Sequence, residues 1–140
     1  MTEDYLIRKG NETDFPDVLE MIKELALFEK APEKVSNSVE KMIKEQDYFE
    51  LFIVEKDQKT VAMALYYYSY YTWVGKSLYL DDLYVKPEHR GNGIGQELIK
   101  NIFTQAKKNN CSRVRWQVLD WNKNAINLYK KLELLLIRNG

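Results

Sequence analysis

A chain of 140 residues, 45% hydrophobic and 30% charged, has the size of one domain and the composition of a folded protein. Its 21 basic and 21 acidic residues cancel to zero formal net charge, which argues against nucleic-acid partners because nucleic-acid-binding domains carry a basic excess or patch. No apolar run reaches the ~18 residues of a membrane span, no signal-peptide pattern opens the chain, and one cysteine with one histidine cannot form a disulfide or a Cys/His zinc site, so we expect a cytoplasmic protein with no membrane partner and no metal.

The first half of the chain alternates helical spacing with runs of β-forming residues. Pro16 suits the first turn of a helix, and Thr13 or Asp14 precedes it as a candidate cap. That helix should end near Ala31, because the residue before a proline avoids the helical conformation. Ser38 can cap a second, shorter helix. The expected elements are a strand at 5–8, a helix from 15 to about 31, a short helix after residue 38, and strands at 49–55, 60–71 and 77–85.

The second half contains a glycine-bearing loop between a strand and a helix. Turns at 57–58 and 73–76 join the three preceding strands into an antiparallel meander. After the loop at 86–93 we expect a helix at 94–109, a strand at 113–118 and a helix at 125–132. The order of elements predicts one mixed α/β (α+β) domain over residues 1–140, with a mostly antiparallel central sheet flanked by helices.

The loop has the chemistry of an anion site. Gly91 and Gly93 permit a tight turn and a close approach of ligand, and the helix that follows offers unpaired N–H groups and a positive dipole to a pyrophosphate. A P-loop would need a lysine after the last glycine, but Gly95 is followed by Gln96. A dinucleotide fingerprint would need another glycine spacing, after the first strand of a parallel unit. The dinucleotide interpretation is therefore weak, and a coenzyme A loop is the third interpretation.

The segment Arg90-Gly91-Asn92-Gly93-Ile94-Gly95 resembles the coenzyme A signature of GNAT acetyltransferases. Segments 23–29, 78–85 and 121–129 further resemble the spermidine/spermine (diamine) acetyltransferases, over about residues 5–132. The resemblance implies a GNAT fold and an acetyl-CoA-dependent transfer to a small primary amine, such as a diamine, a polyamine or thialysine. The acetyl-CoA contacts that it implies are Leu83, Tyr84, Val85, Arg90, Gly91, Asn92, Gly93, Ile94, Gly95, Gln96, Asn122, Ala125 and Tyr129.

The same resemblance implies catalytic and substrate-binding residues. Tyr129 would protonate the departing thiolate, although a core tyrosine would fit the same position. Asp81 stands where the diamine enzymes carry a glutamate that receives the amine proton, although a solvated strand end would look the same. Asp81 and Asp82 are neighbours on a strand, so we expect them on opposite faces. The implied substrate contacts are Phe28, Glu29, Asp81, Arg115, Trp116 and Gln117, where Arg115 would repel a polyamine or favour a carboxylate-bearing amine.

The resemblance ends at Leu132, where the family continues with Gly-Ala and two further strands. The last eight residues can be encoded so that one added base restores Gly-Ala, and a one-base deletion is therefore our hypothesis. Bare sheet edges invite pairing with another chain. We accordingly expect a homodimer, with the tyrosines at 66–71 alternating between the core and the dimer face. Two alternatives stay open: a non-catalytic acetyl-CoA-binding dimer, and a protein or peptide N-acetyltransferase.

Overall fold

The computed structural model describes residues 4–116, and within them five strands form one sheet in the order β1-β2-β3-β4-β5. Neighbours from β1 to β4 are antiparallel, and β5 pairs with β4 in parallel. The strands are β1 (Tyr5–Lys9), β2 (Glu50–Lys56), β3 (Lys59–Tyr71), β4 (Gly75–Val85) and β5 (Arg113–Trp116). The expected meander and its turns are confirmed.

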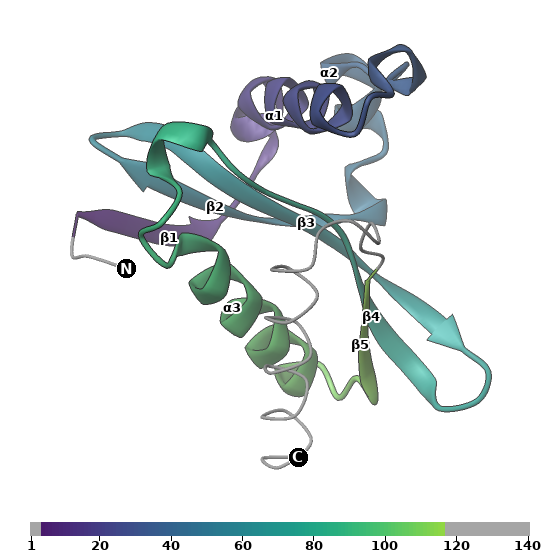
Figure 1. The fold of residues 1–140 in the computed structure, drawn as a ribbon. Helices are drawn as coiled ribbons and strands as arrows, with labels where there is room; N and C mark the ends of the chain where they lie inside the picture. Colours follow the sequence, from purple (N-terminus) through teal and green to yellow (C-terminus); the bar gives the residue numbers. More distant parts are fainter. Residues whose placement is uncertain (1–3, 117–140) are drawn as a thin grey trace.

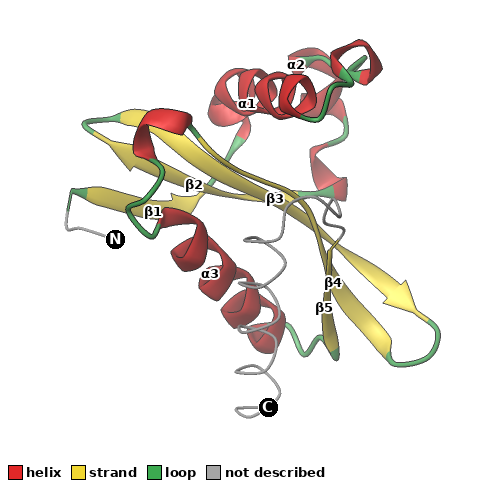
Figure 2. Cartoon of the chain, viewed as in Figure 1, coloured by secondary structure: helices red, strands yellow, loops and turns green. Residues whose placement is uncertain are grey.

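Helices cover both faces of this sheet. Figure 1 shows α1 (Phe15–Phe28) and α2 (Val39–Lys44) on one face and α3 (Ile94–Lys108) on the other. Short 3-10 turns join the elements at Glu12–Asp14, Pro32–Lys34, Gln46–Tyr48 and Pro87–His89 (Figure 2). The expected mixed, mostly antiparallel α/β architecture is confirmed. The strand beyond residue 116 and the helix at 125–132 lie outside the described residues.

Alternation along β3 divides the interior into two cores. Ala64 and Tyr66 face α3, where they pack in one cluster with Leu98 and Ile102. The intervening side chains, such as Met63, belong to a second cluster under α1 and α2. Successive strand residues point to opposite faces, so one long apolar strand serves both layers. No helix of the described residues is long and apolar enough to cross a membrane.

The start of α1 differs from the expected cap. Asp14 occupies the N-cap position of α1, as expected, but its side chain makes no capping hydrogen bond there; Asn11 instead caps the preceding 3-10 turn by accepting the Thr13 N–H. The Asp14 carboxylate is buried and accepts two hydrogen bonds from the Arg8 guanidinium, at 2.6 and 2.8 Å. These bonds hold the pKa of Asp14 below its ordinary value. The Asp14 side chain is therefore held by an ion pair with Arg8 of β1 and does not form the helix cap that the local sequence favours.

The end of α1 also comes earlier than expected, at Phe28. Lys30 adopts a left-handed conformation with φ 61°, and the Ala31 N–H donates to the Ala26 carbonyl at 2.8 Å. This is the hydrogen-bond pattern of a Schellman motif, which closes a helix without requiring proline. The early stop leaves Glu29 at the C-terminal cap of α1, beside the site described next.

Candidate active site

A β-bulge in β4 organises the site. Leu80 pairs with Tyr66 of β3 and Asp82 pairs with Leu65, which leaves Asp81 as an extra residue without a partner on β3. A bulge shifts the alternation of side chains by one position. Before the bulge Leu78 and Leu80 face α3, whereas after it Leu83 and Val85 pack against that same core. Asp82 consequently lies on the α1 side.

This shift corrects the expected placement of the two carboxylates. Asp81 and Asp82 do not lie on opposite faces, because both line one cavity between the sheet and the α1–β2 segment. The sequence carried a signal for this arrangement. The apolar residues facing α3 are spaced by two from Leu78 to Leu80, and then by three to Leu83.

The acidic cavity, as we call it, is open to solvent and has a volume of about 440 Å³. That size is ordinary for a small-molecule site. Its sheet wall holds Asp81 and Asp82, and its helix wall holds charged and polar side chains of the α1–β2 segment. The full lining is Ile22, Lys34, Val35, Ser36, Asn37, Lys41, Met42, Glu45, Phe49, Leu65, Asp81 and Asp82.

Asp82 has the most perturbed carboxyl of the cavity. Burial, together with the negative charges of Asp81 and Glu29, raises the pKa of Asp82 to about 7. Burial also raises the pKa of Asp81, although that side chain stays accessible to solvent. A carboxylate with a pKa near neutrality can accept a proton and release it again at physiological pH. Sequence reasoning selected Asp81 for this chemistry and missed Asp82.

The other expected substrate contacts are only partly brought together. Glu29 lies close enough to raise the pKa of Asp82 but does not line the cavity. Phe28, at the end of α1, is 48% exposed. The Arg115 guanidinium lies 4.4 Å from the centre of the Tyr71 ring and is not part of the lining. Trp116 packs with the core on the α3 face, opposite the cavity, and Gln117 lies outside the described residues.

The glycine loop is held by its own side chains. The Arg90 Nε donates to the Val85 carbonyl at 2.9 Å, and its guanidinium lies 5.4 Å from the centre of the Tyr84 ring. The Asn92 side chain donates to the His89 carbonyl at 2.9 Å. Gly91 and Gly93 take left-handed conformations with φ 84° and 78°, which a side chain would strain.

Helix α3 starts directly at this loop, with Gly93 as its N-cap. The N–H groups of its first turn, including those of Ile94, Gly95 and Gln96, have no acceptor within the helix. Together with the helix dipole they form a site for an anion such as a pyrophosphate. A Cβ on Gly95 would lie 3.9 Å from Leu83, so this glycine packs beside β4 without a close contact.

Among the described residues, none pairs with the outer edge of β4 past the bulge. Within the described residues, β5 pairs with β4 only from Ser77 to Leu80. The Lys86 N–H donates to Val61 of β3, and the Val85 carbonyl accepts from Arg90 instead. Along a strand of an antiparallel pair, the backbone N–H groups point alternately toward and away from the partner strand. Because the Lys86 N–H points toward β3, the N–H groups of Leu83 and Val85 point away from it. Within the part of the chain that the structure describes, no strand pairs with them on that side.

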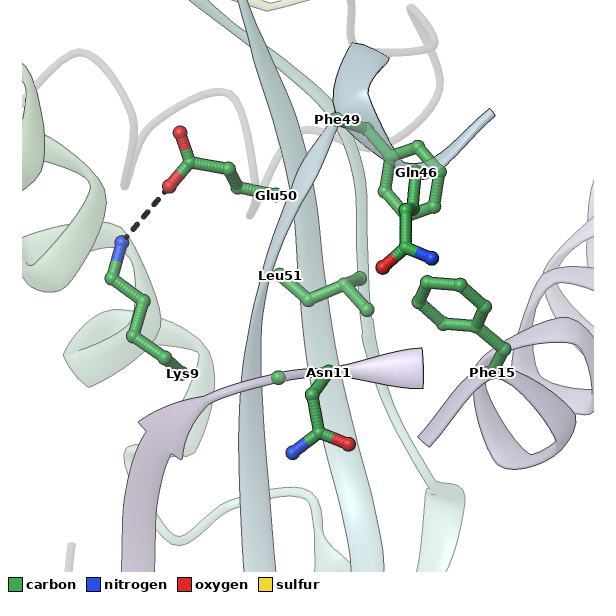
Figure 3. A pocket seen from close by; sticks show the side chains of 8 residues that line it. Lys9, Asn11, Phe15, Gln46, Phe49, Glu50 and Leu51 are labelled. Carbon is green, nitrogen blue, oxygen red and sulfur yellow. Dashed lines mark hydrogen bonds and ion pairs between the residues drawn. The ribbon is translucent and has the colours of Figure 1, made fainter. Parts of the chain in front are cut away.

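A second cavity lies beneath the end of β1 and is too small for a substrate. It has a volume of about 130 Å³, and Figure 3 shows Phe15 and Phe49 on one side of it. On the other side the Lys9 ammonium reaches Glu50 at 3.3 Å, the dashed contact in Figure 3. Among the described residues no group of three or more His, Cys, Asp or Glu side chains is arranged to hold a metal. Because it is larger, the acidic cavity is the stronger candidate for a substrate site than this second cavity.

Asn122, Ala125 and Tyr129, which the sequence assigns to acetyl-CoA contacts or catalysis, lie outside the described residues. Comparisons with known proteins cover this part of the chain as well. Residues 15–133 match the family described as "Acetyltransferase (GNAT) family". The chain is 41% identical to the thialysine N-epsilon-acetyltransferase of Sus scrofa, over 91% of this chain and 82% of the relative.

Two further comparisons agree with these. The human spermidine/spermine N(1)-acetyltransferase-like protein 1 is 34% identical over 89% of this chain, which spans 20% of that longer protein. The fold is similar to that of an aminoglycoside acetyltransferase from an uncultured soil metagenomic sample, crystallised with trehalose. The TM-score is 0.76 at 20% identity, and the match covers 91% of this chain and 86% of that one.

Proposed function

This chain belongs to the acetyltransferase (GNAT) family and is an amine N-acetyltransferase, and from that premise we propose that it acetylates a small primary amine held against Asp82. The observation that carries the proposal is a carboxyl with a pKa of about 7 on the wall of a cavity of substrate size. Thialysine and polyamines are candidate acceptors because the names of the relatives above contain thialysine and spermidine/spermine, and diamines are added by the sequence resemblance.

We propose acetyl-CoA as the acetyl donor. Its pyrophosphate would bind the first-turn N–H groups of α3, with Gly91 and Gly93 allowing the backbone to come close. Its thioester carbonyl would lie along the outer edge of β4, where the N–H groups of Leu83 and Val85 point away from β3. Donors in that position stabilise the negative charge that develops on the oxygen in the transition state.

The proposed reaction is a direct transfer. A primary amine has a pKa near 10.4 in water, so it reaches the site mainly as an ammonium and must lose a proton before it attacks. Asp82, as the carboxylate, takes that proton directly or through water. The amine nitrogen then bonds to the thioester carbon, and as the C–S bond breaks the nitrogen loses its second proton to solvent while the thiolate of coenzyme A takes up a proton. Tyr129, outside the described residues, is the proposed donor of that last proton.

Asp81 has a supporting role in this scheme. Its charge raises the pKa of Asp82, and it adds a second negative group to attract an ammonium into the cavity. Two carboxylates on one wall suit a cationic substrate before reaction and lose that attraction once the amine becomes a neutral amide. The electrostatics of the cavity therefore favour binding of substrate over retention of product.

The direct test is release of coenzyme A from acetyl-CoA by the chain in the presence of putrescine, spermidine, thialysine, lysine or a short peptide. Turnover with at least one small amine, saturable in that amine, is the expected result. Turnover with peptide amines alone would move the assignment to protein acetylation. Binding of acetyl-CoA without turnover on any amine would contradict the proposed function.

A further inference from the structure

We infer that Tyr5 is a positioning residue for the coenzyme: through His89 it holds the glycine loop in the conformation that receives the pyrophosphate. The inference rests on the proposed binding of acetyl-CoA and deepens it, because it adds to that site a residue of the first strand, 84 positions before its partner in the loop. The glycine pattern of the loop gives no sign of this contact.

The glycine loop leaves β4 and reaches the opposite edge strand of the described sheet before α3 begins. The Lys86 N–H donates to the Val61 carbonyl of β3 at 2.9 Å, and three residues later the His89 ring lies against Tyr5 of β1. Figure 1 shows this path from the end of β4 to the side of β1. The Tyr5 hydroxyl and the His89 Nδ1 share a hydrogen bond of 3.0 Å, and the two rings meet edge to face with centroids 5.8 Å apart.

This hydrogen bond fixes where the loop lies. Among the hydrogen bonds that the loop side chains make with described residues, only this one reaches an element other than the strand that the loop follows. The Arg90 Nε donates to the Val85 carbonyl at the end of β4, and the Asn92 side chain donates within the loop. Arg90 and Asn92 therefore shape the loop internally, whereas His89 ties it to β1.

Tyr5 is a rigid anchor for this contact. Its side chain is 8% exposed and packs in one cluster with Val54 of β2 and Ile94, the first residue of α3. On the neighbouring strand, the Lys56 ammonium lies 5.1 Å from the centre of the Tyr5 ring. Close packing in a core holds an aromatic side chain in one rotamer, so the hydroxyl offers the loop a fixed point.

The position of His89 passes to the anion site through Asn92. The Asn92 side chain donates to the His89 carbonyl at 2.9 Å, and Asn92 stands between Gly91 and Gly93, whose left-handed conformations turn the chain into α3. Glycines give a loop many alternative conformations, so a contact that selects one of them reduces the entropy cost of binding. Without the bond to Tyr5, only a fraction of the loop conformations would be able to receive the pyrophosphate.

Calorimetric titration of the full chain with coenzyme A measures this effect. Tyr5→Phe keeps the ring and its packing and removes only the hydroxyl. We expect its Kd for coenzyme A to rise by up to the strength of one hydrogen bond, on the order of fivefold. The kcat with the best acceptor of the amine panel above should be unchanged, because the hydroxyl acts on the loop and not on the reacting atoms. Tyr70→Phe is the matched control and should leave Kd unchanged, since Tyr70 is 76% exposed.

Two substitutions of His89 separate the hydrogen bond from the bulk of the side chain. The amide of asparagine reaches the place of the imidazole Nδ1, so His89→Asn can keep the bond to Tyr5 and should bind coenzyme A nearly as tightly as the unmodified chain. The amide of glutamine reaches the place of Nε2 instead, so His89→Gln should weaken binding as much as Tyr5→Phe does. Because both changes remove the same bond, the double variant should bind no more weakly than either single variant.

The outcomes separate this inference from the proposed function. An unchanged Kd in Tyr5→Phe, equal losses in His89→Asn and His89→Gln, additive losses in the double variant, or an equal rise in Tyr70→Phe would each overturn the role of Tyr5, while acetyl-CoA binding would stand. Urea unfolding checks that every variant is folded, and lower stability with an unchanged Kd would make the bond a purely structural one. An unmodified chain that binds no coenzyme A would overturn the proposed acetyl donor and this inference together.

Discussion

Replacement of Asp82 by asparagine tests the proposed base through stability as well as rate. The pKa of Asp82 is about 7 in the folded chain, against an ordinary value of 3.8. The difference is about 3 pH units, and each unit corresponds to about 1.36 kcal/mol, so the ionised carboxylate destabilises the fold by up to about 4 kcal/mol. Asparagine keeps the shape and removes the charge.

The sign of the pH dependence follows from the raised pKa. Between about pH 4 and pH 7 the folded chain binds a proton at Asp82 that the unfolded chain has released, so the free energy of unfolding falls as pH rises through this range. Asp82→Asn lacks this slope. At pH 8 the variant should therefore be more stable than the unmodified chain, and near pH 4 the two should be similar.

Urea unfolding at several pH values measures this difference, and the pH profile of kcat/KM measures the catalytic side. The unmodified chain should lose activity below about pH 7, because protonated Asp82 cannot accept the amine proton. Asp82→Asn should lower kcat by about 10²–10⁴-fold, and the acidic limb of its pH profile, the fall of kcat/KM at low pH, should disappear. Asp81→Asn is the matched control, and it should move the limb to lower pH, because the charge of Asp81 contributes to the raised pKa of Asp82.

The reverse pattern would refute the reasoning. If Asp81→Asn removed the limb while Asp82→Asn kept it, Asp81 would be the base, as the sequence resemblance implies. If Asp82→Asn were no more stable than the unmodified chain at pH 8, the carboxyl of Asp82 would not have a raised pKa in the folded state.

Three further substitutions probe the loop, the entry to α1 and the leaving group. Gly93→Ala should cost about 1 kcal/mol, because alanine disfavours the left-handed N-cap of α3, and calorimetry should show weaker acetyl-CoA binding. Asp14→Ala should cost about 1–2 kcal/mol in urea unfolding at pH 7, because it removes two charged hydrogen bonds from a partly exposed Arg8 that keeps Glu55 as a partner; since Asp14 has a lowered pKa, the difference from the unmodified chain should shrink as pH falls below about 4. Tyr129→Phe should reduce turnover with little change in coenzyme A affinity, and an unaltered rate would remove Tyr129 from the mechanism.

Local rules predicted the elements of this fold well. The apolar spacing from Ile94 gave α3 to within a residue, and Ser38 is the observed cap of α2. Both depend on neighbours a few positions away, which sequence displays directly. The start of α1 was predicted less well because its decisive contact joins Asp14 to Arg8 on β1, and no local propensity contains that ion pair.

The candidate site was predicted in part. The loop residues from Arg90 to Gly95 carry a glycine pattern whose chemistry is local, and the structure gives Gly91 and Gly93 the left-handed conformations that such a loop needs. The raised pKa of Asp82, on which its proposed role rests, was missed because it depends on burial beneath the α1–β2 segment and on the charge of Glu29, 53 positions before it in the chain. A pKa set by tertiary neighbours has no counterpart in a linear motif.

The bulge at Asp81 connects both halves of the proposed mechanism. By adding one residue to β4 it places Asp81 and Asp82 on the same wall, where their repulsion helps to bring the pKa of Asp82 near neutrality. The same shift keeps Leu83 and Val85 packed toward α3, while their N–H groups point away from β3. Deleting Asp81 would restore regular alternation. Because Asp82 would stay opposite Leu65 and Leu83 would stay directed toward α3, the deletion should keep acetyl transfer and, like Asp81→Asn, move the acidic limb of the pH profile to lower pH.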